Sequence, residues 1–195
     1  GVPVVSSPQK DEGLEVLERV AKLGDAKLIL VGKDIEFKLL DHSVDGQVVS
    51  IRPAKNTQGY PSTSSGQRST TRGIELQIPL LGLHQVENAA TAYAALKVSG
   101  IPIADEQIQK GFSQVQWRAR FEVARRNPPV IFDSAHNQDS FAKLSETLQT
   151  YFPDKMVYLI FGASEDKNIP GMFAELKSKI RKIIVTRADH PRALE

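Results

Sequence analysis

The sequence contains no cysteine, so disulfide bonds and thiolate metal sites are excluded, and this absence is compatible with a reducing cytoplasm. It also lacks an excess of charge of one sign. The 25 basic residues stand against 23 acidic ones, and a formal net charge of +2 gives no broad electrostatic footprint for nucleic acid. No apolar run is long enough to span a membrane, and no signal peptide is recognisable, although residue 1 is glycine rather than methionine. We therefore expect a cytoplasmic protein that binds neither nucleic acid nor a membrane.

Several catalytic and binding motifs are missing as well. The chain has no G-x-x-x-x-G-K-[ST] phosphate-binding loop, no G-x-S-x-G nucleophile turn, and no G-x-G-x-x-G after a predicted strand. Its four histidines are scattered without metal-ligand spacing, so no metal site is predicted within the chain. What is present is a chain of 195 residues, 41% hydrophobic and 25% charged, which is typical of one large globular domain or two small ones.

The first part of the chain predicts a strand–helix–strand unit followed by a hairpin. Residues 2–5 form a short apolar strand that we expect to be buried, and residues 27–31 form a second one. Between them, residues 11–23 carry a helical stripe of apolar side chains, and such a unit is usually parallel and right-handed. A glycine lies between two further strand candidates, near 36–40 and 47–51, and favours a hairpin turn.

A polar segment without periodicity, residues 54–72, interrupts this pattern. It predicts a flexible surface loop, for which a plain linker is favoured over a binding loop because polar loops are common. A strand with alternating polar and apolar residues follows at 74–79. Two helices are then predicted at 84–98 and 105–112, and the first of these is stopped by glycine and proline.

From Trp117 onward, apolar strands alternate with amphipathic helices. We therefore divide the chain into two parts, residues 1–115 and residues 116–195. The alternation predicts an α/β fold with a mainly parallel sheet covered on both faces. The predicted strands are 121–123, 129–132, 157–161 and 183–185, and the predicted helices are 140–151 and 169–180.

Three successive predicted strands end in polar turns, and we expect these turns to share one edge of the sheet, where ligands of open parallel sheets bind. In the first turn, Asp133 can accept hydrogen bonds from ribose hydroxyls, and His136 can donate to a phosphate or to a reacting carboxylate. Asn137 can cap the following helix, whose N-terminus suits phosphate. The other two turns are 162–168 and 186–192. Capping and turn chemistry is an equally good interpretation of the first turn taken alone.

Two further positions are candidates for nucleotide contacts. Arg120 opens the second part, where a guanidinium can reach phosphate or ribose, although a lone arginine is more often a surface charge. Asn88 lies near the start of a helix, where an amide can bind an adenine edge, and an ordinary polar helix start explains it as well.

Five segments carry a family resemblance through their order and spacing. They are LGLHQVENAATA (81–92), WRARFE (117–122), FDSAHNQD (132–139), FGASEDKN (161–168) and TRADHPRA (186–193). In this order they resemble the motifs G-x-H-Q-x-x-N-A-A-x-A, W-P-G-R-[LF]-E, D-G-A-H-N-P-D-S, F-G-A-x-x-D-K-D and T-x-x-x-H-P-R-A of folylpolyglutamate synthase/dihydrofolate synthase, in the Mur ligase superfamily. The departures are Arg118 and Ala119 in place of proline and glycine, and Ser134 and Gln138 in the third motif.

The resemblance implies that residues 1–115 are the end of a central ATPase domain and that residues 116–195 are a Rossmann-like C-terminal domain, truncated at its last strands. It implies an ATP-dependent ligase of the cytoplasm that adds L-glutamate to folate, or to dihydropteroate, through an acyl phosphate. The phosphate-binding loop and the Mg²⁺ ligands of the family lie upstream and have no counterpart here, so this chain alone is expected to be inactive. The full-length parent is expected to be a monomer.

The resemblance also implies roles for single residues. Asn88 is expected to contact adenine, and Asp133 is expected to hold the ribose. Arg120 is expected to bind the nucleotide from the C-terminal domain, with its orientation setting domain closure. His136 and Asn137 are expected to line the cleft near the phosphates and the acceptor.

Two alternatives remain open at this stage. One is a stand-alone Rossmann-like module that binds a nucleotide or a partner protein without catalysis. The other is a peptidoglycan-precursor ligase of the same superfamily, against which the His-Gln and His-Pro-Arg motifs argue.

Overall fold

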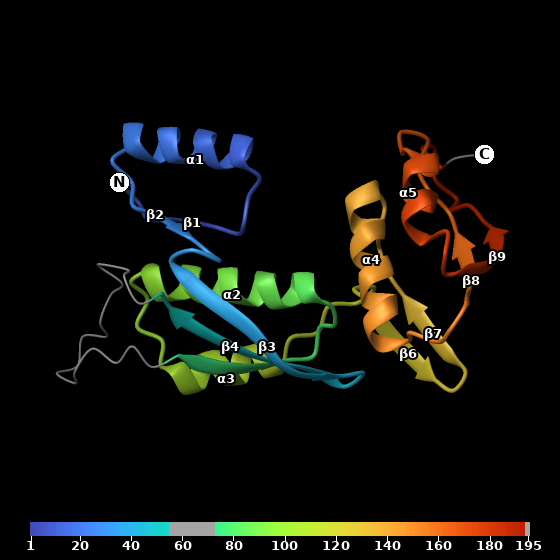
Figure 1. Ribbon diagram of the computed structural model, residues 1–195, viewed down its shortest axis with the longest axis horizontal. Coiled ribbons are helices and arrows are strands. Elements are labelled where there is room, and N and C mark those ends of the chain that lie inside the picture. The colour runs from blue at the N-terminus through green and yellow to red at the C-terminus, as the bar shows by residue number, and fades with distance from the viewer. Residues whose placement is uncertain (55–72, 194–195) are drawn as a thin grey trace. The chain divides into compact units, whose positions relative to one another are not determined.

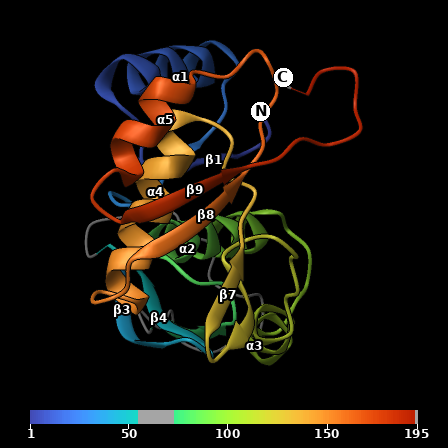
Figure 2. The same ribbon diagram turned by 90° about the vertical axis from the view of Figure 1, so that its right-hand side faces the viewer.

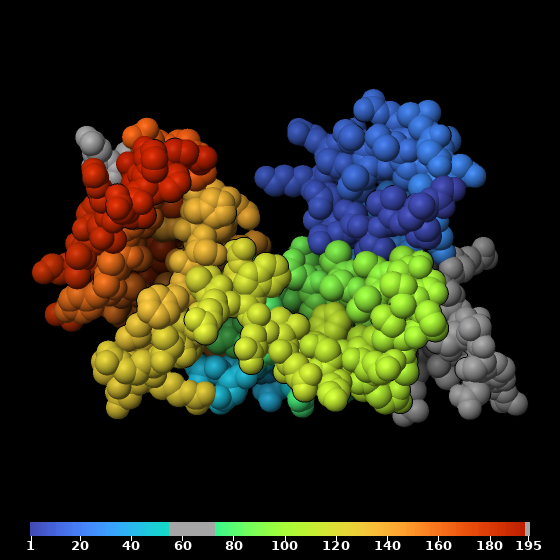
Figure 3. All heavy atoms as spheres, turned by 180° about the vertical axis from the view of Figure 1, so that it is seen from behind, coloured from blue at the N-terminus to red at the C-terminus, as the bar shows by residue number. Residues whose placement is uncertain are grey.

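The computed structural model describes residues 1–54 and 73–193 (Figure 1). The loop predicted at 54–72 thus falls almost wholly outside the described residues. The chain divides into two compact units, Gly1–Gln116 and Trp117–Glu195. In Figure 3, which draws all heavy atoms, the second unit carries the colours from yellow to red. Each unit has its own helices and sheets, which together give the predicted α/β class.

The first unit opens with the predicted strand–helix–strand unit. Strand β1 (Val4–Ser6) pairs in parallel with β2 (Leu28–Leu30), and helix α1 (Asp11–Leu23) connects them. The expectation of a buried first strand is wrong, because Val2 and Val4 are 81% and 37% exposed. Side chains alternate between the faces of a strand. Val5 accordingly packs on the core, whereas Val4 points the other way.

An antiparallel sheet forms the centre of the first unit. Its strands are β3 (Ile35–Ser43), β4 (Gly46–Pro53) and β5 (Ile74–Ile78). Gly46 starts β4 with φ +148°, and a Cβ at this position would lie 2.8 Å from the carbonyl oxygen of Ile78. The predicted hairpin is therefore confirmed, and its turn requires glycine.

Two helices cover this sheet. Helix α2 (Leu83–Val98) contacts β3 and β4, whereas α3 (Asp105–Ser113) contacts β5 (Figure 1). Strand β5 alternates buried and exposed residues, and its buried face joins the same apolar cluster as the buried side of α2. The fully buried members of this cluster are Ile35, Val49, Ile51, Leu76, Ala90 and Ala94.

The second unit contains two strand pairs of different kinds. Strands β6 (Glu122–Arg126) and β7 (Pro129–Phe132) form an antiparallel hairpin, whereas β8 (Val157–Phe161) and β9 (Ile180–Val185) are parallel. The expected parallel arrangement thus applies to β8 and β9, which lie side by side in Figure 2. The first pair is antiparallel because only Asn127 and Pro128 connect it, and a parallel crossover needs a dozen or more residues.

Helices α4 (Gln138–Tyr151) and α5 (Ile169–Leu176) pack against each other in this unit. Three phenylalanine rings fill the space between them and β8, with centroids of Phe161 and Phe173 only 5.0 Å apart. Helix α5 ends earlier than the predicted 169–180 because Ile180 already pairs with Val157 as the first residue of β9. No helix within the described residues is long and apolar enough to cross a bilayer.

Candidate functional site

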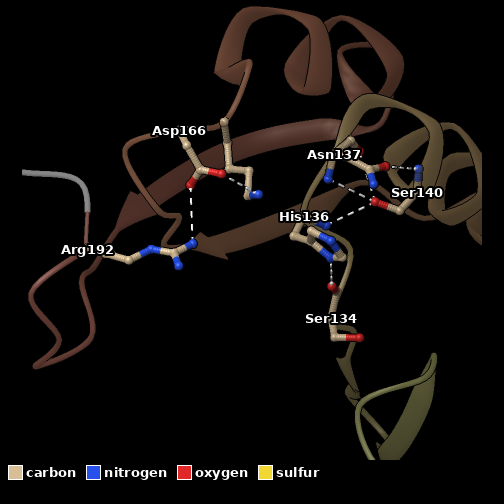
Figure 4. Close-up of polar contacts among 7 residues, drawn as sticks. Ser134, His136, Asn137, Ser140, Asp166 and Arg192 are labelled. Atoms are coloured by element: carbon tan, nitrogen blue, oxygen red, sulfur yellow. Dashed lines mark hydrogen bonds and ion pairs between the residues drawn. The ribbon is translucent and has the colours of Figure 1, made fainter.

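Asn137 begins helix α4 as its N-cap. Its Oδ1 accepts a hydrogen bond from the backbone N–H of Ser140 at 2.8 Å, while the hydroxyl of Ser140 accepts from the backbone N–H groups of His136 and Asn137 (Figure 4). The capping interpretation of this turn is therefore realised in the structure, because the Oδ1 of Asn137 is used locally. The Nδ2 amide of Asn137 has no hydrogen-bond partner among residues 1–54 and 73–193, so it can donate to another group.

His136 is oriented by its own turn. Its Nδ1 lies 3.0 Å from the carbonyl oxygen of Ser134, and the ring as a whole is exposed (Figure 4). A carbonyl only accepts, so this contact requires a proton on Nδ1 and leaves Nε2 directed elsewhere. The neutral ring then offers Nε2 as an acceptor, and donation to a phosphate or carboxylate requires the imidazolium form.

Asp133 connects two segments that are separated by a strand pair. Its Oδ2 accepts from the backbone N–H of Phe121 at 2.8 Å, and its Oδ1 accepts from the backbone N–H of Ala135 at 2.7 Å. Each carboxylate oxygen can accept more than one hydrogen bond, so capacity for a ribose hydroxyl remains. The sequence indicated the second contact, which is a local turn, but not the first.

Arg120 sits at the tip of a turn with unusual backbone geometry. Its neighbours Ala119 and Phe121 have φ values of +55° and +47°, a region that non-glycine residues rarely adopt. The guanidinium lies 5.4 Å from the centre of the Trp117 ring, and both side chains are exposed. Within the described part of the chain Arg120 has no ion pair, so its charge is available for an anion.

The turns after β8 and β9 lie next to each other. The backbone N–H of Thr186 donates to the carbonyl of Phe161 at 2.8 Å, and that of Glu165 donates to the carbonyl of Arg192 at 3.1 Å. The guanidinium of Arg192 lies 3.8 Å from the carboxylate of Asp166 (Figure 4). The pKa of Asp166 is below its ordinary value because Lys167 donates a hydrogen bond to it at 2.8 Å, with Arg192 contributing more weakly.

The turn after β7 is connected to α5 through the first residue of α4. The side chain of Gln138, the first residue of α4, donates to Glu175 of α5 at 2.8 Å. A Cβ on Gly171, in the first turn of α5, would lie 2.8 Å from the Oε1 of Gln138. The three polar turns of the second unit therefore adjoin one another, but they do not share the edge of one sheet as expected, because β7 pairs with β6 in a sheet separate from that of β8 and β9.

Asn88 belongs to the first unit, on the exposed side of α2. Its Nδ2 donates to Oε1 of Gln85 at 3.2 Å, and Nε2 of Gln85 lies 3.1 Å from Nε2 of His84. Gln85 is buried, so its hydrogen bond orients the amide of Asn88. One Nδ2 hydrogen and the Oδ1 of Asn88 remain for an adenine edge. Its approach to residues of the second unit stays a prediction.

The described residues contain no group of three or more histidine, aspartate or glutamate side chains that could hold a metal ion. A cavity of about 230 Å³ lies beside the β3–β4 turn, lined among others by Asp41, His42 and Gln77, and none of the predicted site residues lines it.

Sequence reasoning did not predict that three further residues contact the predicted site residues or their backbone. They are Trp117, beneath Arg120, Glu122, beside the same turn, and Gln85, beneath Asn88. All three lie inside the motifs quoted above, and this position is the one feature of the sequence that could have indicated their role.

Residues 119–195 match the family described as Mur ligase, glutamate ligase domain. The chain is 32% identical over 199 residues to the dihydrofolate synthase/folylpolyglutamate synthase of Bacillus subtilis, which covers 99% of this chain and 42% of that protein. Its fold resembles the folylpolyglutamate synthase of Thermotoga maritima, with a TM-score of 0.77 at 26% identity, over 99% of this chain and 42% of the other. It also resembles the Mycobacterium tuberculosis folylpolyglutamate synthase complexed with ADP, with a TM-score of 0.79 at 27% identity, over 99% and 40%.

The chain thus spans less than half of the length of each of these relatives. The matched segment includes the turns that carry Arg120, Asp133 and His136. The sequence comparison and the structure comparisons point to the same group of enzymes. The chain is therefore similar, in sequence and in fold, to folylpolyglutamate synthase/dihydrofolate synthases, and its residues 119–195 match the glutamate ligase domain of Mur ligases.

Proposed function

We propose that this chain is the nucleotide-facing part of an ATP-dependent ligase that adds L-glutamate to folate, and that the full-length parent carries out the reaction. The observation that supports this most is the gathering of the turns after β7, β8 and β9 on one side of the second unit, with His136 and Asp133 in the first of them. Carboxyl ends of strands are where α/β proteins bind nucleotides.

The proposed reaction has two steps. The γ-phosphoryl group of ATP is transferred to a carboxylate oxygen of the folate or of its glutamate tail, and ADP leaves. The amine of the incoming glutamate then attacks the acyl carbon, so that an amide bond forms and inorganic phosphate leaves. Phosphorylation makes the second step possible because phosphate is a far better leaving group than an oxide.

The side chains of this chain fit the binding of ATP as a substrate. Arg120 offers an exposed guanidinium without an ion pair among the described residues, which suits a phosphate. Asp133 retains acceptor capacity for ribose, and His136 in its charged form can donate from Nε2 to a phosphate or carboxylate oxygen. Asn88 offers one donor and one acceptor to adenine. Mg²⁺ is assigned no ligand here and belongs to the proposed upstream part.

The ribose role of Asp133 is tested in the full-length parent. Asp133→Ala is expected to raise the KM for ATP by about tenfold or more, because it removes a charge-assisted hydrogen bond to the nucleotide. Steady-state kinetics with varied ATP, at saturating folate and glutamate, measure this. Asp139→Ala is the control, since Asp139 is an exposed carboxylate in the first turn of α4, the helix that follows Asp133.

Unchanged ATP kinetics in the Asp133→Ala protein contradict the ribose role. Asp133→Asn separates the two functions of the side chain, because one amide oxygen can still accept from Phe121. The alternative of a binding module without catalysis is supported instead if the parent binds ADP but shows no glutamate-dependent release of phosphate. We further propose a monomeric parent in the cytoplasm.

A further inference from the structure

The turn that carries Arg120 is held in a costly conformation. Ala119 and Phe121, the residues on either side of it, both have φ values in the left-handed region. Residues with a Cβ lose conformational free energy there, so such a geometry persists only where surrounding contacts impose it. Two such residues flanking one arginine indicate that the direction of its side chain is what the contacts fix.

Two carboxylates supply these contacts, one on each side of Arg120. Oε2 of Glu122 accepts from the backbone N–H of Ala119 at 2.9 Å, and Oδ2 of Asp133 accepts from that of Phe121 at 2.8 Å. A third bond, from the backbone N–H of Ser134 to the carbonyl of Ala119 at 2.9 Å, ties the two turns together. The backbone of the turn is therefore anchored before and after Arg120.

The side chain of Phe121 anchors the turn in the hydrophobic core of the second unit. It is only 3% exposed, and its ring lies 6.1 Å from the ring of Tyr151 and 6.3 Å from that of Phe152, at the end of α4. Arg120 in contrast projects outward over Trp117. Because the Phe121 side chain is buried in one direction, the neighbouring Arg120 side chain is directed to the opposite side, toward solvent.

The charges are also arranged so that Arg120 remains available. Glu122 and Asp133 both accept hydrogen bonds from backbone N–H groups of the turn, and neither forms an ion pair with the guanidinium among the described residues. Their negative charge satisfies the amides and is not used to neutralise the arginine. We propose that Glu122 is a positioning residue, which holds the turn so that the Arg120 guanidinium faces the phosphates of ATP.

This inference rests on the proposed function, because it needs a nucleotide that Arg120 binds. It predicts that Glu122 acts on ATP use only through Arg120. In the full-length parent, Glu122→Ala is expected to raise the KM for ATP by about tenfold, with the KM for glutamate unchanged, since a misdirected arginine loses its phosphate contact. Glu122→Gln keeps an oxygen at the same place and is expected to restore ATP use to within about twofold.

The decisive comparison is a double-mutant cycle with Arg120→Ala. If Glu122 works through Arg120, the Glu122→Ala change costs nothing further in the Arg120→Ala background, whereas an independent structural role adds its full effect there. Glu146→Ala is the matched control, because Glu146 is an exposed carboxylate of α4 whose side chain has no partner among the described residues. Thermal unfolding of each variant checks the fold.

The outcomes are separable. If Arg120→Ala raises the KM for ATP but Glu122→Ala does not, or if Glu122→Gln is as impaired as Glu122→Ala, the positioning role is overturned and the proposed function stands. If Arg120→Ala itself leaves ATP use unchanged, the proposed nucleotide contact fails, and the inference fails with it. Should Glu122→Ala not fold, Glu122→Asp replaces it, because this variant keeps the charge but withdraws the oxygen by one methylene.

Discussion

At the scale of single residues, the buried phenol of Tyr93 predicts how the free energy of unfolding changes at alkaline pH. Its side chain on α2 is only 6% exposed, and burial raises its pKa to about 12 from an ordinary value of 10.0, with the carboxylate of Asp105 adding to the effect. Between these two pH values the unfolded chain releases the phenol proton while the folded chain keeps it. The free energy of unfolding is therefore expected to fall through this window, by roughly 2 kcal/mol in total.

Urea unfolding of the chain at a series of pH values from neutral to strongly alkaline measures this loss. Tyr93→Phe is expected to remove most of it, because phenylalanine has no proton to release. Tyr158→Phe is the control, since Tyr158 is 60% exposed. An alkaline loss of stability that is the same in Tyr93→Phe as in the unchanged chain contradicts the prediction.

Individual residues also mark the limit of what the sequence predicts about the site. Asp133, His136 and Asn137 were predicted as site residues because they follow a strand in a polar turn, which is a local pattern. The contact of Asp133 with the backbone of Phe121 was not found, because it depends on the left-handed φ of Phe121. Ala119 and Phe121 have no intrinsic preference for that region, so only the surrounding packing selects it.

At the scale of elements, two helices of the second unit begin with the same kind of cap. Asn137 caps α4 through Ser140 at 2.8 Å, and Asn168 caps α5 through the backbone N–H of Gly171 at 3.1 Å. Asn137→Ala is expected to lower the free energy of unfolding by about 1 kcal/mol, because an N–H of the first turn of α4 loses its partner. Chemical denaturation, with Asn137→Ser as the variant that keeps the cap, measures this.

The same pair of variants separates capping from a nucleotide contact at Asn137. If the side chain only caps, Asn137→Ser retains both stability and ATP use in the parent. If its Nδ2 amide also touches the nucleotide, Asn137→Ser retains stability but raises the KM for ATP. A full loss of stability in Asn137→Ser would instead show that the capping contact is not what stabilises α4.

The bounds of helices were predicted well, because the period of apolar residues determines them. The bounds of strands were predicted less well, because they depend on pairing with other strands. Helices α1, α2 and α4 follow their apolar stripes to within two residues of the predicted ends. Strand β9 starts at Ile180 rather than at residue 183, because a short apolar run fits a helix end and a buried strand equally well. The antiparallel pairing of β6 with β7 was missed because the predicted strand ended at residue 123, whereas β6 continues to Arg126 and leaves a link of only two residues.

At the scale of the whole molecule, the proposed nucleotide contacts come from both units of the chain, and they do not include a phosphate-binding loop. Asn88 lies in the first unit, whereas Arg120 and Asp133 lie in the second, and none of the 195 residues forms a G-x-x-x-x-G-K-[ST] loop. Such a loop cradles phosphates with backbone N–H groups and a lysine, and phosphoryl transfer depends on that positioning. A single arginine cannot replace it.

The isolated 195-residue chain is therefore expected to show no ATP-dependent addition of glutamate to a folate substrate, whereas the full-length parent shows it under the same conditions. Release of phosphate that depends on both folate and glutamate is the readout, and the parent carrying Arg120→Ala serves as a control for residual activity. Robust turnover by the isolated chain would mean that its own residues position the transferred phosphoryl group. That result would contradict the proposal that the upstream part of the parent binds the transferred phosphate while Arg120 and Asp133 bind the rest of the nucleotide.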